Sequence, residues 1–173
     1  ISSGGIKIYD DNNIESSTLL SFEGTDSSNL AKLIVEAADV NLTNSIFVKT
    51  GVIVENENNL TISGDSITYD VASSGIFAKS GAGTMTIAQT SGGLGFSMGE
   101  IDVLQGIMSV TTDVNVSTVS VLGDTSAMAL SNSTMTVANN FVLSGYDDFD
   151  ILSAELNVGE NLYLENGDFN VNM

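Results

Sequence analysis

Apolar and polar residues alternate over short runs along most of the chain. Runs such as Val-Asn-Leu at 40–42 and Leu-Thr-Ile at 60–62 place two apolar side chains on one side of an extended strand and a polar one on the other. Gly, Asn, Asp and Ser, which favour turns, separate these runs. The pattern predicts strands at 6–9, 40–42, 46–48, 52–54, 60–62, 67–69, 85–87, 101–104, 107–110, 114–116, 119–122, 135–137, 141–143, 156–158, 162–164 and 169–171.

The segment 29–38 is the one place with a helical composition. It reads Asn-Leu-Ala-Lys-Leu-Ile-Val-Glu-Ala-Ala, and Asn29 could cap a helix there. The alternative is a strand through 33–35. We favour the strand, because the rest of the chain has the alternating pattern.

Four segments of similar sequence indicate an internal repeat. The segments 59–63, 83–88, 133–138 and 160–165 each carry alternating apolar residues behind a small or polar residue, and they look like the same strand in successive units. The first two are separated by roughly 25 residues and the last two by a similar gap. Two further units would then lie between Met85 and Met135.

Repeating units of short strands are typical of a solenoid, in which each strand pairs with its equivalents in the neighbouring rungs. We therefore predict an all-β parallel β-helix over residues 1–173, with rungs of roughly 20–25 residues. An antiparallel sandwich is the alternative, because it also has short, evenly spaced strands. It is less favoured, because Asn166-Gly167 is the one strong hairpin turn and aromatic residues are few.

The charge of the chain is strongly acidic. Asp and Glu total 22, against four lysines, which gives a net charge of −18. Such a surface repels nucleic acid and anionic lipid, since both are bound through basic contacts. No apolar run approaches the roughly 20 residues that span a bilayer, so we expect no membrane insertion by this segment.

Two absent residue types exclude familiar chemistries. Without Cys there is no disulfide or thiolate, and without His the usual general base and the commonest metal ligand are missing. No Gly-x-Ser-x-Gly motif occurs either. We therefore predict a protein that is not an enzyme and needs no cofactor.

The segment 76–110 has a pattern with defined spacing. A Lys-x-Gly-x-Gly-Thr run at 79–84 leads into a strand, and a turn-rich loop, a Gly and two further strands follow. This order resembles the passenger-associated repeat of autotransporter passenger domains. The residues on the pattern are Lys79, Gly81, Gly83, Thr84, Thr86, Gly99, Val103, Gly106 and Val110.

The resemblance implies a right-handed parallel β-helix at the surface of a Gram-negative cell or in the extracellular medium. It also implies that this chain is a segment of a longer exported protein, without its membrane anchor. That family includes adhesins, toxins and proteases, so membership alone does not define a function.

Acidic residues supply the candidates for metal binding and catalysis. Asp147, Asp148 and Asp150 could bind calcium, but a solvated turn is the simpler interpretation. Asp147 with Asp148, or Glu55 with Glu57, could form the carboxylate pair of a glycosidase, but nothing distinguishes them from the other acids. We predict neither a metal site nor a catalytic pair.

The remaining motifs have simple explanations. The glycine-rich segment 91–97 has Ser97 where a calcium-binding repeat needs Asp. Chance accounts for four Asn-x-Ser/Thr sequons, and strand propensity accounts for two Thr-x-Thr pairs. These residues are Asn41, Asn59, Asn115 and Asn132 for the sequons, and Thr84, Thr86, Thr134 and Thr136 for the pairs.

The sequence therefore favours a structural and interaction module, the stalk or binding surface of a bacterial surface adhesin or autotransporter passenger. Its expected partners are glycans or proteins of host or bacterial surfaces, or copies on other cells, and not nucleic acid. A glycan-binding or glycan-degrading β-helix, such as a phage tailspike segment, is the alternative.

Overall fold

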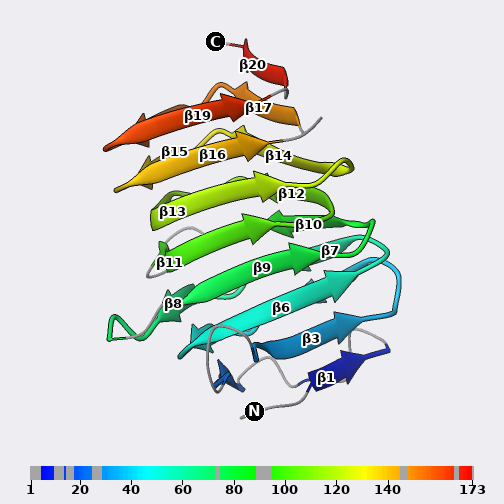
Figure 1. The fold of residues 1–173 in the computed structure, drawn as a ribbon. Helices are drawn as coiled ribbons and strands as arrows, with labels where there is room; N and C mark the ends of the chain where they lie inside the picture. The colour runs from blue at the N-terminus through cyan, green and yellow to red at the C-terminus, as the bar shows by residue number, and fades with distance from the viewer. Residues whose placement is uncertain are drawn as a thin grey trace.

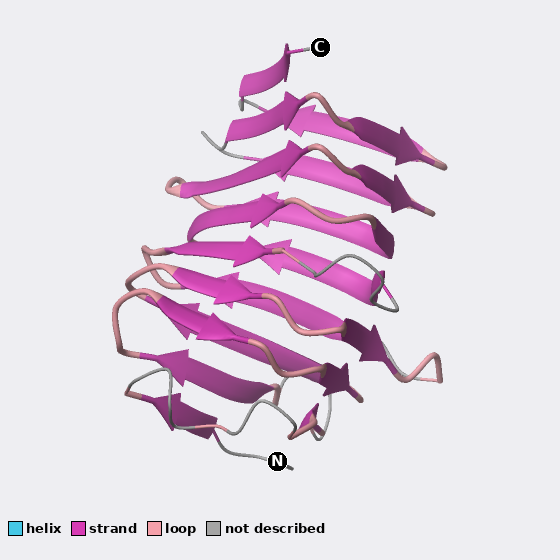
Figure 2. Cartoon of the chain, turned by 180° about the vertical axis from the view of Figure 1, so that it is seen from behind, coloured by secondary structure: helices cyan, strands magenta, loops and turns pink. Residues whose placement is uncertain are grey.

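The computed structural model describes residues 5–9, 14, 18–24, 29–72, 75–88, 95–144, 148–165 and 168–172. Within these residues the chain forms 20 strands in two sheets, with no helix, and neighbouring strands run parallel. The strands stack as a β-solenoid of about six turns with rungs of about 21 residues (Figures 1 and 2). The predicted all-β parallel solenoid is confirmed. No helix in the described residues is long and apolar enough to cross a membrane.

Each complete turn passes through three faces, and two of these faces belong to one sheet. Face A contains β1 (Gly5–Ile8), β3 (Ala31–Val35), β6 (Gly51–Asn56), β9 (Ile76–Ser80), β16 (Asn140–Ser144) and β19 (Asn161–Glu165). Face B contains β2 (Leu20–Phe22), β5 (Ile46–Val48), β8 (Ser66–Tyr69), β15 (Thr134–Val137) and β18 (Glu155–Val158). Face C contains β4 (Val40–Leu42), β7 (Leu60–Ile62), β10 (Thr84–Ile87), β12 (Gly106–Val110), β14 (Ser126–Ser131), β17 (Asp148–Leu152) and β20 (Asp168–Asn172).

Two long strands belong to both face A and face B. The first parts of β11 (Gly95–Val103) and β13 (Val114–Leu122) pair within face B, and their second parts pair within face A. The chain changes face at Gly99 in β11 and at Ser117 in β13, both of which are small residues. The other described rungs make the same passage with two separate strands.

The interior is built from ladders of inward side chains in register. On face C one ladder reads Val40, Leu60, Met85, Met108, Met128, Phe149 and Phe169. The ring of Phe149 lies 4.7 Å from that of Phe141 and 5.5 Å from that of Phe169, measured between centroids. Because each inward side chain packs against its equivalents one rung away, a single continuous core runs along the stack.

Burial in this stack depends on neighbouring rungs. Phe141 and Leu143 of β16 are fully buried. Their partners one rung later, Leu162 and Leu164 of β19, are 42% and 47% exposed, because no described strand follows β19 on face A. An inward position is therefore covered from both sides only within the stack.

Every predicted strand is confirmed, with 114–116 and 119–122 joined in the single strand β13, and the segment 29–38 contains the strand β3 rather than a helix. Four strands were not predicted: β2, β9, β14 and β17. In β14 the inward positions alternate with Ala, and in β17 they alternate with Asp and end in Leu152. Short or acidic outward residues made these strands resemble turns.

The prediction that four similar segments form one ladder is wrong in part. Residues 59–63 and 83–88 do share face C, where Leu60 pairs with Met85. The third segment, around β15, lies on face B, and the fourth, around β19, lies on face A. All three faces bury alternating apolar side chains against one core, so a similar sequence does not identify a face.

The corner between faces A and C depends on glycine. Gly81 and Gly106 have φ angles of +83° and +74°, a region that L side chains rarely adopt. A Cβ on Gly81 would overlap the carbonyl oxygen of Asn56 one rung below, and a Cβ on Gly106 would overlap that of Gly81. Gly83 is equally close to Asn58. The rungs can reach ladder spacing here because these positions carry no side chain.

We predict that Gly106→Ala lowers the free energy of unfolding by about 2–4 kcal/mol, from a strained φ and a backbone clash together. Urea denaturation measures the loss. Ser109→Ala is the matched control, because Ser109 is an outward residue of the same strand. Equal stability of the Gly106→Ala protein and the parent would contradict the tight corner.

Candidate binding groove

The residues of the predicted repeat motif lie in adjoining rungs in one region of the solenoid. Lys79 lies in β9, Gly81 and Gly83 form the A–C corner after it, and Gly106 opens β12 directly above. Thr84 and Thr86 point outward from β10, and Gly99 lies where β11 changes face. Thr134 and Thr136 are on face B, so the two Thr-x-Thr pairs do not form one array.

Lys79 is completely buried although it carries an amino group. It occupies an inward position of face A, between Val54 below and Val103 above. Its Nζ donates hydrogen bonds to three backbone carbonyl oxygens, those of Ser80 at 2.9 Å, Gly81 at 2.6 Å and Gln105 at 3.0 Å. The motif gave no sign that Lys79 is buried, but the alternation of Ile76-Phe77-Ala78-Lys79 puts it on the same side of the strand as the buried Phe77.

The buried position changes the acidity of this lysine. Desolvation lowers the pKa of Lys79 from 10.5 to about 8, and the negative charge of Glu57 offsets part of that shift. The three carbonyl groups supply the acceptors that a buried ammonium needs. Lys79 therefore links the glycine corner of one rung to the rung above.

The acidic candidates for a calcium site are only partly described. Asp147 lies outside the described residues. Asp148 and Asp150 are on the strand β17, not in the expected turn, and they flank the inward Phe149. Asp150 Oδ1 accepts a hydrogen bond of 3.1 Å from Asn170 in the next rung. Within the described ranges, no group of three or more acidic side chains is placed to hold a metal ion.

The other candidate pair, Glu55 and Glu57, has separate contacts. Glu55 points outward from β6, and its carboxylate lies 3.8 Å from the Lys32 ammonium. Glu57 lies in the turn after β6 and accepts a hydrogen bond of 3.3 Å from the backbone N–H of Ala82. Each carboxylate is therefore engaged with a different neighbouring rung.

A carboxyl group outside these candidate sites, that of Asp102, has a strongly shifted pKa. Asp102 points outward from β11 between Ala78 and Ser120 and is half-buried. Burial and, to a smaller extent, the charge of Glu100 raise the pKa of Asp102 to about 6, although a hydrogen bond from Ser120 opposes the shift. Ala78 and Ser120 are small, so the neighbouring strands can shield the Asp102 carboxylate from water. These small residues were the feature of the sequence that could have indicated its burial.

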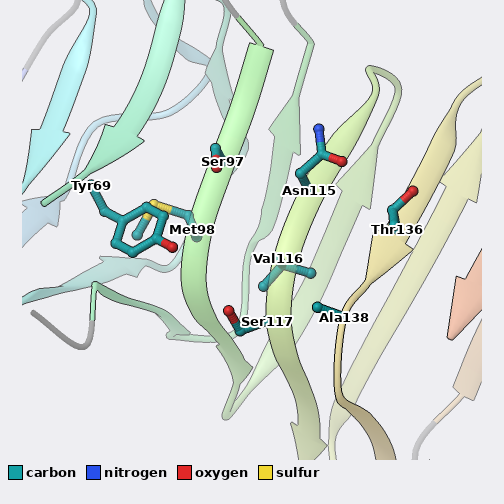
Figure 3. Close-up of a pocket in the computed structure, with 8 residues that line it drawn as sticks. All are labelled: Tyr69, Ser97, Met98, Asn115, Val116, Ser117, Thr136 and Ala138. Carbon is teal, nitrogen blue, oxygen red and sulfur yellow. The ribbon is translucent and has the colours of Figure 1, made fainter. Parts of the chain in front are cut away.

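A groove runs across four rungs at the edge between faces B and A (Figure 3). Its volume is about 190 Å³. Tyr69 of β8 lies at one end, and Thr136 and Ala138 of the β15 rung lie at the other, with β11 and β13 between them (Figure 3).

The groove exists because one ladder stops early. β8 pairs with β11 only through Ser66 and Ile67, so Tyr69 has no partner on β11. The chain leaves the sheet after Tyr69 and returns at Gly75, whose carbonyl oxygen accepts hydrogen bonds from the N–H groups of Gly99 at 3.2 Å and Glu100 at 3.3 Å. The groove is the space that remains on face B where this pairing stops.

Gly75 also positions the aromatic ring. Its φ is +55°, and a Cβ there would overlap the ring of Tyr69. The ring thus packs directly on the Gly75 backbone while it lines the groove. In the rungs above the ring, the groove is lined by two residues with small side chains, Ser117 and Ala138, which leave it open.

The lining combines an apolar floor with polar side chains. Met98 and Val116 are buried beneath the groove. Ser97 pairs with Asn115, and Asn115 pairs with Thr136, so three outward polar groups follow one ladder. At a strand spacing of about 4.8 Å, these groups extend over about 10 Å.

These polar groups differ from comparable ones elsewhere on the solenoid. On faces A and C, outward amides bond to the neighbouring rung: Asn161 donates to Asn140 at 3.0 Å, and Asn170 to Asp150. Within the described part of the chain, Asn115 makes no such side-chain bond to Ser97 or Thr136. Its amide is therefore available to a ligand. In the sequence Asn115 stands out only as part of a sequon, because nothing local shows that it lines the same groove as Tyr69.

We predict that Lys79 makes stability depend on alkaline pH. Its folded pKa is lower than the unfolded value, so between about pH 8 and 10.5 the unfolded chain binds more protons, and the free energy of unfolding rises with pH. Relative to Lys79→Met, the parent should gain about 2–3 kcal/mol between pH 7 and pH 10. Urea denaturation of both proteins at each pH tests this, with Lys32→Met as the exposed control. A constant difference would mean that the folded and unfolded pKa values are alike.

We predict that Asp102 makes the stability of the fold depend on pH in the acidic range. Its folded pKa is above 3.8, so its stabilising contribution is present below that value and is lost as the pH rises through about 6. Asp102→Asn should therefore be more stable than the parent by about 1–2 kcal/mol at pH 7.5 and similar to it near pH 3.5. Thermal unfolding at the two pH values measures this. Asp148→Asn controls for the loss of one exposed carboxylate, and an Asp102→Asn protein that gained nothing at pH 7.5 would contradict the burial effect.

No family model, curated protein or solved structure matches the chain. The chain is a parallel β-solenoid that carries a groove lined by uncharged residues on the edge between faces A and B.

Proposed function

We propose that this chain is a rigid scaffold segment of an exported bacterial surface protein, of the adhesin or autotransporter-passenger kind, and that its long sides provide a binding surface. The proposed role is structural and adhesive, without catalysis. The observation that carries the proposal is the continuous register of parallel ladders on face A, from β1 to β19, and on face C, from β4 to β20.

Mechanical stiffness follows from those ladders. Bending the rod would have to stretch hydrogen bonds and separate packed rungs on one side while compressing the other side. A stalk that holds a binding region away from a cell needs this property. The lateral faces repeat at rung spacing, so they offer a regular surface to a ligand.

Charge and the repeat motif give further support. A net charge of −18 favours solubility and disfavours binding to nucleic acid. The Lys79-to-Gly106 pattern resembles the passenger repeat, and its glycines lie at a corner where stacked rungs need them. The glycines of the motif are needed to stack rungs at this corner, and a passenger stalk built from stacked rungs would need them for the same reason.

The surface location can be tested on producing cells. An antibody against this segment should stain intact cells as strongly as permeabilised cells, and an antibody against a cytoplasmic protein should stain only the latter. Deleting this segment from its parent protein should lower attachment of the cells to surfaces or to other cells. Staining that appears only after permeabilisation would reject the proposed location.

A further inference from the structure

We propose that the groove between Tyr69 and Thr136 is a binding site for one ring of a neutral saccharide. This inference rests on the proposed surface role, and it names the class of ligand that the binding surface would contact. The argument uses the aromatic ring, the polar ladder, the charge and the size of the groove.

Tyr69 provides the stacking surface. Aromatic rings bind apolar, flat surfaces while a polar tip stays solvated, and the C–H face of a pyranose is such a surface. The Tyr69 ring is half-buried, is packed on Gly75 and lines the hollow, so binding would need little reordering of it.

The polar ladder provides hydrogen bonds. A sugar ring has hydroxyl groups around its edge, and each can both donate and accept. Ser97, one rung from Tyr69, carries a hydroxyl with the same dual capacity, and the Asn115 amide on the next rung offers an acceptor and two donors. Thr136 lies a further rung away, about 14 Å from β8 at about 4.8 Å per strand, so its hydroxyl would contact the next sugar of a glycan and not the ring stacked on Tyr69. This set suits hydroxyl groups better than it suits a charged ligand.

The charge and the size of the groove restrict the class of ligand further. None of the groove residues is acidic or basic, and the chain as a whole repels anions. Pockets that enclose a drug-sized molecule have about 300–1,000 Å³. A groove of about 190 Å³ therefore accommodates one ring, with the rest of a glycan extending along the solenoid.

The test uses the full chain and saturation-transfer NMR with defined sugars. The probes are the methyl glycosides of glucose, galactose, mannose and N-acetylglucosamine, with glucuronic acid as the anionic comparison. We expect at least one neutral glycoside to bind with a dissociation constant on the order of 1 mM, as suits one shallow ring site. Tyr69→Leu and Asn115→Asp should each weaken binding about tenfold or more, and Tyr69→Phe should retain it.

Tyr163→Leu is the matched control, because Tyr163 is 48% exposed on β19 and lies outside the groove. Thermal unfolding verifies that each variant folds, and Asn115→Asp decides the matter if Tyr69→Leu does not fold. The inference is overturned if no neutral glycoside binds, if both groove variants bind like the parent, or if glucuronic acid binds better. Antibody staining of intact cells does not depend on the groove, so failure of the saccharide site would leave the proposed surface location standing.

Discussion

In-register stacking of parallel strands is the constraint on which the rest of this structure depends. Each inward side chain is covered by its equivalents one rung below and one rung above, as the difference between Phe141 and Leu162 shows. Two rungs can approach to ladder spacing only if nothing projects between them. That requirement explains why glycine occupies the corner at Gly81 and Gly106, where a side chain would collide with the backbone of the rung below.

The same constraint determines where a ligand can bind. A regular ladder produces a flat face whose outward side chains bond to each other, as Asn161 does to Asn140. A hollow forms where the ladder between β8 and β11 ends after Ile67 and the chain leaves the sheet. The interruption costs backbone pairing in one rung, and it leaves Tyr69 without a paired residue on β11. A groove for a ligand therefore forms only where the regular pairing of strands is interrupted.

Sequence alternation was sufficient to predict the fold class, the rung length and most strands, because every face of the solenoid buries alternating residues against one core. It could not assign strands to faces: residues around Met85 and Met135 look alike but lie on different faces. Nor could it locate the groove, since Tyr69 and Thr136 line the same groove only after four rungs have stacked. The buried state of Lys79 was implied by its place in the alternation, but its three acceptors come from the end of its own strand, from the turn that follows and from the next rung.

The burial of Lys79 has a consequence for how the molecule can be handled. Of the four lysines, Lys7, Lys32 and Lys49 lie in the first rungs and are exposed, whereas Lys79 is enclosed and no lysine follows it. Reagents that couple to amines will therefore attach only near the N-terminal end of the solenoid. A chain immobilised in this way would stand with its later rungs directed away from the support, so chemical coupling alone would produce an oriented layer of rods.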